Sequence, residues 1–396
     1  MRILADENMP AVAALFDDVA TEIRTCPGRT MTPAALADVD VLLVRSVTRV
    51  DADLLSRADH LRFVGSATIG TDHVDRACLA DRSIPFAWAP GCNALGVVDF
   101  VLGALLLQFP DDPAALRKKR VAVVGAGNVG GRLVSRLRAL GLQVDVCDPP
   151  REATGEPGPD GAPESRFVSL QEAFTADIVC CHAPLTVSGG WPTQGMVTAD
   201  LMMQMPEHAI VLNAGRGGVI ASDVLRETLR RRPDLQLLLD VWDPEPDLPL
   251  DIMAHTRMAT GHIAGYSLEG RVRGTWMLRR AVAEELGLAP PVQSVTDLLP
   301  RAPTISLNAA ELPDDAWQVL REAVLRVCDP VGDDQRFREA IGAVSAKDRG
   351  SAFDAYRRDY AGRAAPRREL GSTVIEHQGL GDEALRLLRT AGFIVR

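Results

Sequence analysis

The chain has 396 residues, of which 46% are hydrophobic and 24% are charged, a composition typical of a globular protein with substantial cores. At about 100–200 residues per domain, this length predicts two or three domains. The net charge of −10 at pH 7 argues against a nucleic-acid-binding surface, because such surfaces are normally basic.

Cysteine usage and the N-terminal segment bear on location. The seven cysteines form no CxxC pair, and their odd number favours reduced thiols in a cytoplasmic protein. The segment MRILADENMP enters a predicted strand at once and lacks the long apolar region of a signal peptide. The most apolar helical run, 94–108, contains Asp99 and is too short to span a membrane. We therefore expect a cytoplasmic protein without a membrane segment.

The first hundred residues alternate short apolar runs with helical stretches. Strands are predicted at 2–6, 39–46, 61–68 and 84–91. Such alternation indicates βαβ units and a parallel sheet with both faces covered. Ligands of such sheets bind at the carboxyl ends of strands, so Arg45, Ser46 and residues 66–71 form candidate binding loops.

A second α/β region is predicted from Arg120 to about residue 260. Its strands are expected at 121–125, 143–148, 176–183, 209–215 and 235–242. Residues 151–165 are rich in glycine, proline and acidic residues, and we expect them to form an exposed, mobile loop.

The remainder of the chain has a different pattern of predicted strands and helices. A helix is predicted at 270–287, followed by a proline-containing linker at 289–295. Beyond it, strands are expected at 304–308, 372–377 and 392–396, with helices at 314–327 and 383–391. This α+β tail has no recognisable phosphate loop or metal cluster, and no metal site is predicted anywhere in the sequence.

The motif GAGNVG indicates a dinucleotide site. It places Gly125, Gly127 and Gly130 in GxGxxG spacing between a predicted strand and helix, and Asp148 ends the next strand. The glycines permit a tight turn, close approach of a pyrophosphate and helix–strand packing. An acid at Asp148 favours NAD over NADP, although Arg151 weakens that preference. The alternative is a turn that binds nothing, with an acid capping the next loop.

Three polar residues stand at or beyond the ends of predicted strands. Arg216 lies in NAGRGGVI, Glu245 in LDVWDPEP and His262 in GHIAGY. Singly, each has an ordinary structural interpretation, as a surface arginine, a solvated loop acid and a half-buried histidine. Together they suit oxidation of a 2-hydroxy acid. A histidine exchanges the alcohol proton, a carboxylate orients the imidazole, and a guanidinium pairs with the substrate carboxylate.

These three motifs, in this order after GAGNVG, resemble the D-2-hydroxyacid dehydrogenase family. Further segments resemble its members in the vitamin B6 pathway: LADENMP, LVRSVT, FVGSATIGTDHVD, APGCNALGVVDFV, VCDPPR and HIAGYSLEGRVRGT. The resemblance covers roughly 1–290 and extends more loosely to the tail through FDAYRRDY, 353–360. It implies oxidation, at C2, of a phosphorylated hydroxy acid, 4-phospho-D-erythronate.

The resemblance also implies site residues. Arg216, Glu245 and His262 fall at catalytic positions, with His262 as the acid/base. The cofactor positions for NAD are Gly125, Gly127, Asn128, Val129, Gly130, Asp148, Ala183, Gly215, Asp240 and Gly265. The substrate positions are Ser46, Thr68 and Tyr266, with Arg45 as a cation for the phosphate. Ala183 stands where relatives often carry threonine, and Asp99 where glutamate is expected. Arg349, Arg357 and Arg358 are further phosphate candidates, reaching in from a partner subunit.

The implied architecture is α/β, with two Rossmann-like or flavodoxin-like parallel-sheet domains, a cleft between them and a small C-terminal domain. Residues 1–95 and 258–287 form the substrate domain, 96–257 the NAD domain and 288–396 a dimerisation domain of a homodimer. Two alternatives stay open. One is another family member, acting on 3-phosphoglycerate or a plain 2-hydroxy acid. The other is an NAD-sensing co-repressor that binds protein partners.

Overall fold

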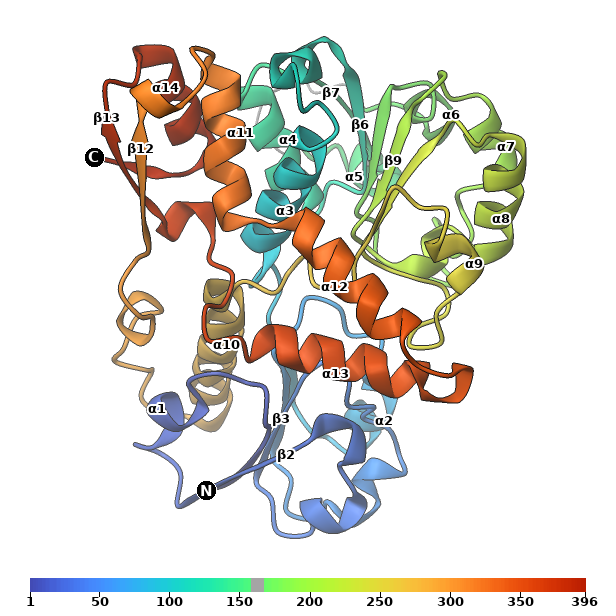
Figure 1. Cartoon of the computed structure of the whole chain (residues 1–396). Coiled ribbons are helices and arrows are strands. Elements are labelled where there is room, and N and C mark those ends of the chain that lie inside the picture. The colour runs from blue at the N-terminus through green and yellow to red at the C-terminus, as the bar shows by residue number, and fades with distance from the viewer. Residues whose placement is uncertain (158–166) are drawn as a thin grey trace. The chain divides into compact units, whose positions relative to one another are not determined.

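The computed structural model describes residues 1–157 and 167–396, which fold into two compact units (Figure 1). Unit 1 consists of Met1–Asn93 and Tyr266–Arg301, and unit 2 of Ala94–Gly265 and Ala302–Arg396. The division of the chain into substrate, NAD and dimerisation domains by function stays a prediction.

Unit 1 is built on a five-stranded parallel sheet in the order β2-β1-β3-β4-β5. Its strands are β1 (Arg2–Asp6), β2 (Glu22–Cys26), β3 (Val41–Val44), β4 (Phe63–Ser66) and β5 (Phe86–Trp88), and its helices are α1 (Val12–Phe16), α2 (Arg76–Asp81) and α10 (Leu268–Leu286). Alternate side chains of β3 enter two different cores. Leu42 and Val44 pack in one, while Val41 and Leu43 pack in the other with Leu278 of α10. The sheet is therefore covered on both faces, as the apolar run predicts.

Unit 2 contains a six-stranded parallel sheet in the order β11-β10-β9-β8-β6-β7. Its strands are β6 (Arg120–Val124), β7 (Gln143–Cys147), β8 (Ile178–Cys181), β9 (Ile210–Asn213), β10 (Gln236–Leu239) and β11 (Met258–Ala259). The helices of this part are α3 (Ala94–Leu106), α4 (Gly130–Ala139), α5 (Pro149–Thr154), α6 (Leu170–Ala173), α7 (Ala199–Met203), α8 (Ser222–Arg231) and α9 (Leu250–Met253). The chain order reverses between β7 and β8 on either side of β6, which makes a switch point where such sheets bind ligands.

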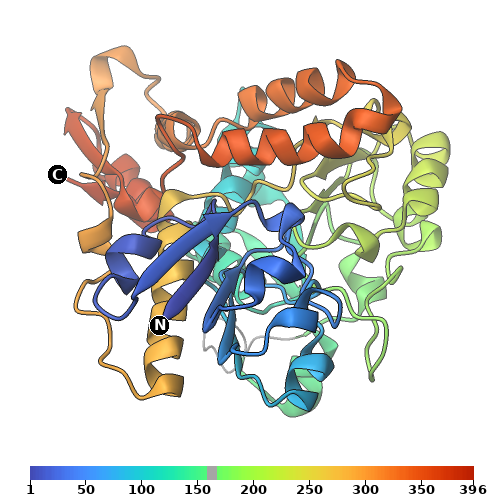
Figure 2. The same cartoon turned by 90° about the horizontal axis from the view of Figure 1, so that it is seen from below.

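The tail adds a three-stranded parallel sheet, in the order β12-β13-β14, and four helices to unit 2. The elements are β12 (Thr304–Asn308), α11 (Ala316–Val327), α12 (Pro330–Gly342), α13 (Arg349–Ala361), β13 (Val374–Gln378), α14 (Asp382–Ala391) and β14 (Ile394–Val395). Helices α12 and α13 lie side by side as a hairpin (Figures 1 and 2). Their contact is aromatic, with Phe337 of α12 against Phe353 and Tyr356 of α13.

The predicted strands are confirmed, although most are shorter than the apolar runs that indicated them. The run 235–242, for example, leaves the sheet after Leu239, and its last three residues belong to the loop beyond β10. Strands β2 and β11 were not predicted. The sequence of β2, EIRTC, lies at the sheet edge with no side chain fully buried, and β11 has only two residues. Helices α12 and α13 were not predicted either.

The predicted loop 151–165 is wrong at its beginning. Residues 151–154 belong to helix α5, because Asp148 caps the helix by accepting a hydrogen bond from Arg151 N and prolines occupy its first turn. Residues 158–165 of that prediction lie outside the described residues.

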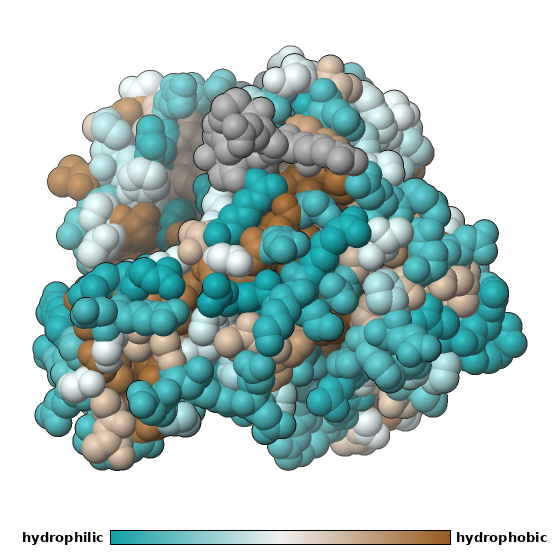
Figure 3. Space-filling view, turned by 90° about the horizontal axis from the view of Figure 1, so that it is seen from above, coloured by the Kyte–Doolittle hydropathy of each residue, from teal (hydrophilic) through white to brown (hydrophobic). Residues whose placement is uncertain are grey.

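Helix α3 is a core helix, as predicted, since all its residues except Leu95 are buried. Across the two described stretches, no helix combines the length and apolar character needed to cross a membrane. The face seen in Figure 3 is mainly hydrophilic, with apolar residues in small groups broken by polar ones.

Candidate active site

The glycine-rich turn after β6 leaves room only for backbone. Gly125 has φ +87°, and a Cβ there would lie 2.6 Å from Ala183 N. A Cβ on Gly130 would lie 1.9 Å from Gly125 O. A Cβ on Gly127, in contrast, would meet no atom within 4 Å. The first and third glycines are therefore required for packing, and the space beside the second, at the start of α4, is open.

Asp148 ties this turn to the end of β7. Its Oδ2 accepts a hydrogen bond of 2.7 Å from Ala126 N, and its Oδ1 accepts one of 3.2 Å from Arg151 N. The acid thus caps α5 and also holds the glycine turn. The Arg151 guanidinium donates to Ala126 O at 3.0 Å and pairs with Glu156 at 3.3 Å. Its charge is partly compensated, which weakens any attraction for a 2′-phosphate.

The other predicted cofactor residues lie around the same edge of the sheet. Asn128 and Val129 precede the first turn of α4, where Asn128 is exposed. Ala183 follows β8, and Gly215 follows β9, where an added Cβ would lie 3.1 Å from Cys181 O. Gly265 closes the segment after β11 and is half-buried. At Gly215 an added side chain would press against the backbone that follows β8.

Asp240 organises the loop that carries the predicted proton carrier. This carboxylate, 2% exposed, accepts hydrogen bonds from Thr260 Oγ1 (2.6 Å), Ile263 N (2.9 Å) and Ala264 N (3.0 Å). The Asp240 backbone oxygen also accepts from His262 N at 2.6 Å. Four hydrogen bonds therefore join Asp240 to residues 260–264 and fix the course of this loop. The sequence placed Asp240 near NAD and missed this bracing role.

His262 adopts a conformation that non-glycine residues rarely adopt, with φ +58°. Its Nδ1 lies 2.8 Å from Glu245 Oε2, and Glu245 Oε1 accepts a bond of 2.9 Å from Trp242 N. A carboxylate at Nδ1 selects the tautomer that carries its proton there, which leaves Nε2 as the proton acceptor. Burial raises the pKa of Glu245, but the charge and hydrogen bond of His262, with the charge of Arg357, lower it below its ordinary value.

Arg216, Glu245 and His262 follow β9, β10 and β11, which are neighbours in the sheet. Gly217 brings the first two loops together, since a Cβ there would lie 1.8 Å from Trp242 O. Arg216 is half-buried and its Nη1 donates to Gly215 O at 2.9 Å. The strand order therefore gathers at one edge three residues that are far apart in sequence.

In unit 1, the predicted substrate residues also lie at carboxyl ends of strands. Arg45 and Ser46 follow β3, and the Arg45 guanidinium lies 5.1 Å from the centre of the Tyr266 ring. Thr68, beyond β4, hydrogen-bonds Ser66 Oγ at 2.7 Å and Gly70 O at 2.9 Å. Ser46 is exposed, while Tyr266 is buried.

A second cation near Arg45 was missed. Arg271 of α10 donates from Nη2 to Asn8 O at 2.8 Å, in the loop after β1, the neighbour of β3. Burial, together with the charge of Arg45, lowers the pKa of Arg271 to about 10. A single arginine on a helix carries no sequence signal for such a pairing, because the contact depends on strand order.

Comparison with known proteins shows to which family the chain belongs. Residues 109–264 match the family described as D-isomer specific 2-hydroxyacid dehydrogenase, NAD binding domain. Over 393 residues, the chain is 44% identical to the erythronate-4-phosphate dehydrogenase of Pseudomonas aeruginosa (strain UCBPP-PA14), with 99% of each covered. It is 42% identical, over 397 residues and 100% of each, to that of Aeromonas salmonicida (strain A449).

The chain belongs to the erythronate-4-phosphate dehydrogenase family. The narrower resemblance noted in the sequence is thereby confirmed, and so are the NAD cofactor and the oxidoreductase class.

Solved structures agree on the fold. One is the NAD-bound 3-phosphoglycerate dehydrogenase of Entamoeba histolytica, with a TM-score of 0.61 and 19% identity over 74% of this chain and 99% of that one. Another is the TT0316 protein of Thermus thermophilus, with a TM-score of 0.60 and 24% identity over 74% and 100%. The predicted α/β class with parallel sheets is confirmed.

Proposed function

We propose that this chain oxidises 4-phospho-D-erythronate at C2 to (R)-3-hydroxy-2-oxo-4-phosphooxybutanoate, with NAD, in pyridoxal phosphate biosynthesis. Full-length similarity to erythronate-4-phosphate dehydrogenases supports the substrate. The observation that carries the chemistry is the hydrogen bond between His262 Nδ1 and Glu245 Oε2, which leaves Nε2 ready to accept a proton.

The residues of unit 2 divide the reaction between them. His262 Nε2 takes the proton of the C2 hydroxyl as the C2–H bond breaks. Glu245 holds the imidazole and stabilises the imidazolium that forms. Arg216 binds the substrate carboxylate through two parallel hydrogen bonds, a geometry suited to guanidinium. Bound NAD supplies the acceptor for the hydride that leaves C2. Protons and electrons then balance, with the hydroxyl converted to a ketone.

The open turn at Gly127 fits a dinucleotide. Gly125 and Gly130 shape the turn, and the backbone at the start of α4 binds the pyrophosphate. Asp148 accepts hydrogen bonds from the ribose hydroxyls with its remaining lone pairs. Asn128, Val129, Ala183, Gly215, Asp240 and Gly265 complete the cofactor site in this proposal.

The residues of unit 1 recognise the rest of the substrate. Ser46, Thr68 and Tyr266 contact the hydroxy acid, and Arg45 contributes positive charge for its phosphate. The half-buried Arg45 guanidinium keeps its charge, because Tyr266 and Asp6 raise its pKa although burial alone lowers it. The predicted division, with residues 1–95 and 258–287 for substrate binding and residues 96–257 for NAD binding, is part of this proposal. Residues 258–265, which include His262, belong to unit 2.

Self-association and location complete the proposal. We propose a homodimer formed through residues 288–396, which the family resemblance assigns to dimerisation. A cytoplasmic location is proposed on the seven free cysteines of the chain, five of which are buried.

The decisive experiment is single-turnover oxidation of 4-phospho-D-erythronate by the purified protein with excess NAD, followed by the absorbance of reduced nicotinamide. D-3-phosphoglycerate and D-glycerate are the parallel substrates. Reduction with the four-carbon phosphate alone supports the proposal. Reduction with 3-phosphoglycerate instead contradicts the proposed substrate. Absence of turnover with all three, in a folded protein that binds NAD, favours a sensor that binds protein partners.

A further inference from the structure

The helical hairpin formed by α12 and α13 packs against the loops that carry Glu245 and His262, the proposed acid–base pair. Asp334 of α12 accepts a hydrogen bond of 2.6 Å from Ala259 N in β11, three residues before His262. On the same helix, Arg338 donates to Met253 O at 2.6 Å and to Thr256 O at 3.0 Å. Helix α12 is thus bound directly to the strand that leads into His262.

Helix α13 contacts the neighbours of both members of the pair. A Cβ added at Gly261, next to His262, would lie 2.8 Å from ring atoms of Tyr356 and Phe337. A Cβ added at Gly350, in the first turn of α13, would lie 3.3 Å from Pro246, next to Glu245. One helix therefore lies against the chain on both sides of the bond between Glu245 and His262.

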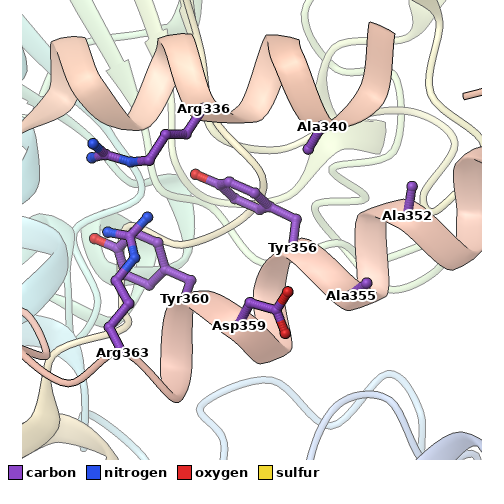
Figure 4. Close-up of a pocket in the computed structure, with 8 residues that line it drawn as sticks. All are labelled: Arg336, Ala340, Ala352, Ala355, Tyr356, Asp359, Tyr360 and Arg363. Carbon is purple, nitrogen blue, oxygen red and sulfur yellow. The ribbon is translucent and has the colours of Figure 1, made fainter. Parts of the chain in front are cut away.

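The hairpin holds this position through its own polar and aromatic contacts. Figure 4 shows Tyr356 and Tyr360 of α13 extending toward α12. Tyr356 Oη donates to Asp333 O at 3.2 Å, and Tyr360 Oη to Asp333 Oδ2 at 3.0 Å. Phe337 of α12 also meets Trp242, with ring centres 6.2 Å apart. Because Trp242 N binds Glu245, the aromatic cluster is continuous with the acid–base pair.

Arg357 follows Tyr356 on α13 and is only 7% exposed. Its guanidinium lies 5.4 Å from the centre of the Phe353 ring. The pKa of Glu245 is affected by burial, by His262, by Arg357 and by the bond from Trp242 N, and the arginine acts to lower it. Gly350 and Arg357 are seven residues apart on α13 and lie on the same face of the helix, the face that meets Pro246 next to Glu245. Burial of Arg357 limits the screening of its charge by water.

We propose that Arg357 is a positioning residue for the proposed reaction, stabilising the negative charge of Glu245 and, through Glu245, the orientation of His262. The tail, to which the sequence assigned dimerisation and phosphate contacts with a partner subunit, then forms part of the acid–base apparatus of its own chain. This inference rests on the proposed function. It differs from the sequence expectation that Arg357 reaches a partner subunit's substrate phosphate.

The test compares Arg357→Gln with Arg357→Lys and with Arg386→Gln. Arg386 is a matched control, because it is an exposed arginine on a helix of the tail. In the described part of the chain its one ion pair is with Glu383, at 3.7 Å. Since a positioned acid–base group contributes about 10²–10⁴-fold, we expect Arg357→Gln to lower kcat roughly tenfold. KM for the hydroxy acid and the affinity for NAD should change less than about twofold, within the range of surface effects.

Two readouts separate positioning from a purely structural role. Loss of the cation raises the pKa of Glu245, so the acid limb of the kcat profile should move to higher pH in Arg357→Gln. Arg357→Lys restores a charge and should recover most of kcat. In protein labelled with ¹⁵N-histidine, the ring signals of His262 should change in Arg357→Gln and stay unchanged in Arg386→Gln.

Other outcomes overturn the inference. A raised KM with unchanged kcat means that Arg357 binds substrate directly. An unchanged pH profile and unchanged His262 signals, with only a lower melting temperature, mean that Arg357 merely stabilises the fold. Oxidation of a different hydroxy acid by the wild type overturns the proposed substrate but not the role of Arg357, and the kinetic comparison is then made with that acid. The ¹⁵N signals decide the role of Arg357 even if no tested acid is oxidised.

Discussion

The two units present their polar residues in contrasting ways. In unit 2, Asp240, Glu245 and His262 are joined by short hydrogen bonds to each other or to nearby backbone. In unit 1, Thr68 is also hydrogen-bonded, but Ser46 is exposed and Arg45 lies over an aromatic ring. Proton transfer needs an imidazole held in one tautomer and orientation, whereas recognition of a charged group tolerates an adjustable side chain. We therefore expect substitutions in unit 2 to lower kcat and substitutions in unit 1 to raise KM.

The largest effect is expected at His262, the proposed proton carrier. His262→Gln should lower kcat about 10²–10⁴-fold, because the alcohol proton then has no positioned acceptor. Steady-state kinetics with 4-phospho-D-erythronate measures the loss, and titration with NAD should show unchanged cofactor affinity. A loss of less than tenfold would assign proton transfer to another group.

The contact between the Arg216 and Glu245 loops is tested by a single methyl group. Gly217→Ala places a Cβ 1.8 Å from Trp242 O, so the loop that leads to Glu245 must move. We expect about 1–3 kcal/mol lower stability, as for an overpacked core, together with reduced kcat. Chemical denaturation measures the first quantity. Gly218→Ala is the control, because its Cβ meets only the Leu185 side chain, at 3.2 Å. Equal effects of the two changes would contradict this reasoning.

Arg45 tests the contrasting behaviour of unit 1. Arg45→Ala should raise KM for 4-phospho-D-erythronate roughly tenfold, since a hydrogen bond to a charged group contributes about 1.5–3 kcal/mol. The value of kcat should stay close to wild type, because the acid–base pair is untouched. D-Erythronate, which lacks the phosphate, is the control substrate and should be affected less. Unchanged affinity for the phosphorylated acid would remove Arg45 from the phosphate site.

Asp99, a buried carboxylate of unit 2 outside the candidate site, should affect stability alone. Burial raises its pKa to about 7, although Leu370 N donates to Oδ2 at 2.9 Å and Arg136 lies 3.5 Å away. A raised pKa means that its stabilising contribution is present below about pH 4 and is lost as pH rises through 7. The Asp99→Asn variant has no carboxyl group at this position, so its unfolding free energy does not depend on this protonation.

We therefore expect the unfolding free energy of Asp99→Asn, relative to wild type, to rise by roughly 1–3 kcal/mol between pH 5 and pH 8.5. Urea denaturation at both pH values measures the difference. A relative stability that is the same at both would show that Asp99 keeps an ordinary pKa in the folded protein.

Much of the fold was visible in the sequence, because it depends on local pattern. Buried strands such as Val41–Val44 are continuous apolar runs, and the GxGxxG spacing specifies a turn whose steric demands at Gly125 and Gly130 the structure displays. Edge strand β2 and helices α12 and α13 were missed, since their sequences are polar or mixed and their burial comes from contacts distant in the chain.

In the candidate site, too, some features follow from the local sequence and others only from the tertiary structure. The sequence by itself determined which side chains have suitable chemistry, namely His262 as a proton acceptor, Glu245 as its partner and Arg216 as a cation, because residue type and motif are local properties. Only the tertiary structure decided that Asp240 braces the His262 loop, that Gly217 allows two loops to touch and that α13 lies against both sides of the acid–base pair. These contacts join segments that approach one another only through strand order and helix packing, and no local pattern encodes such distances.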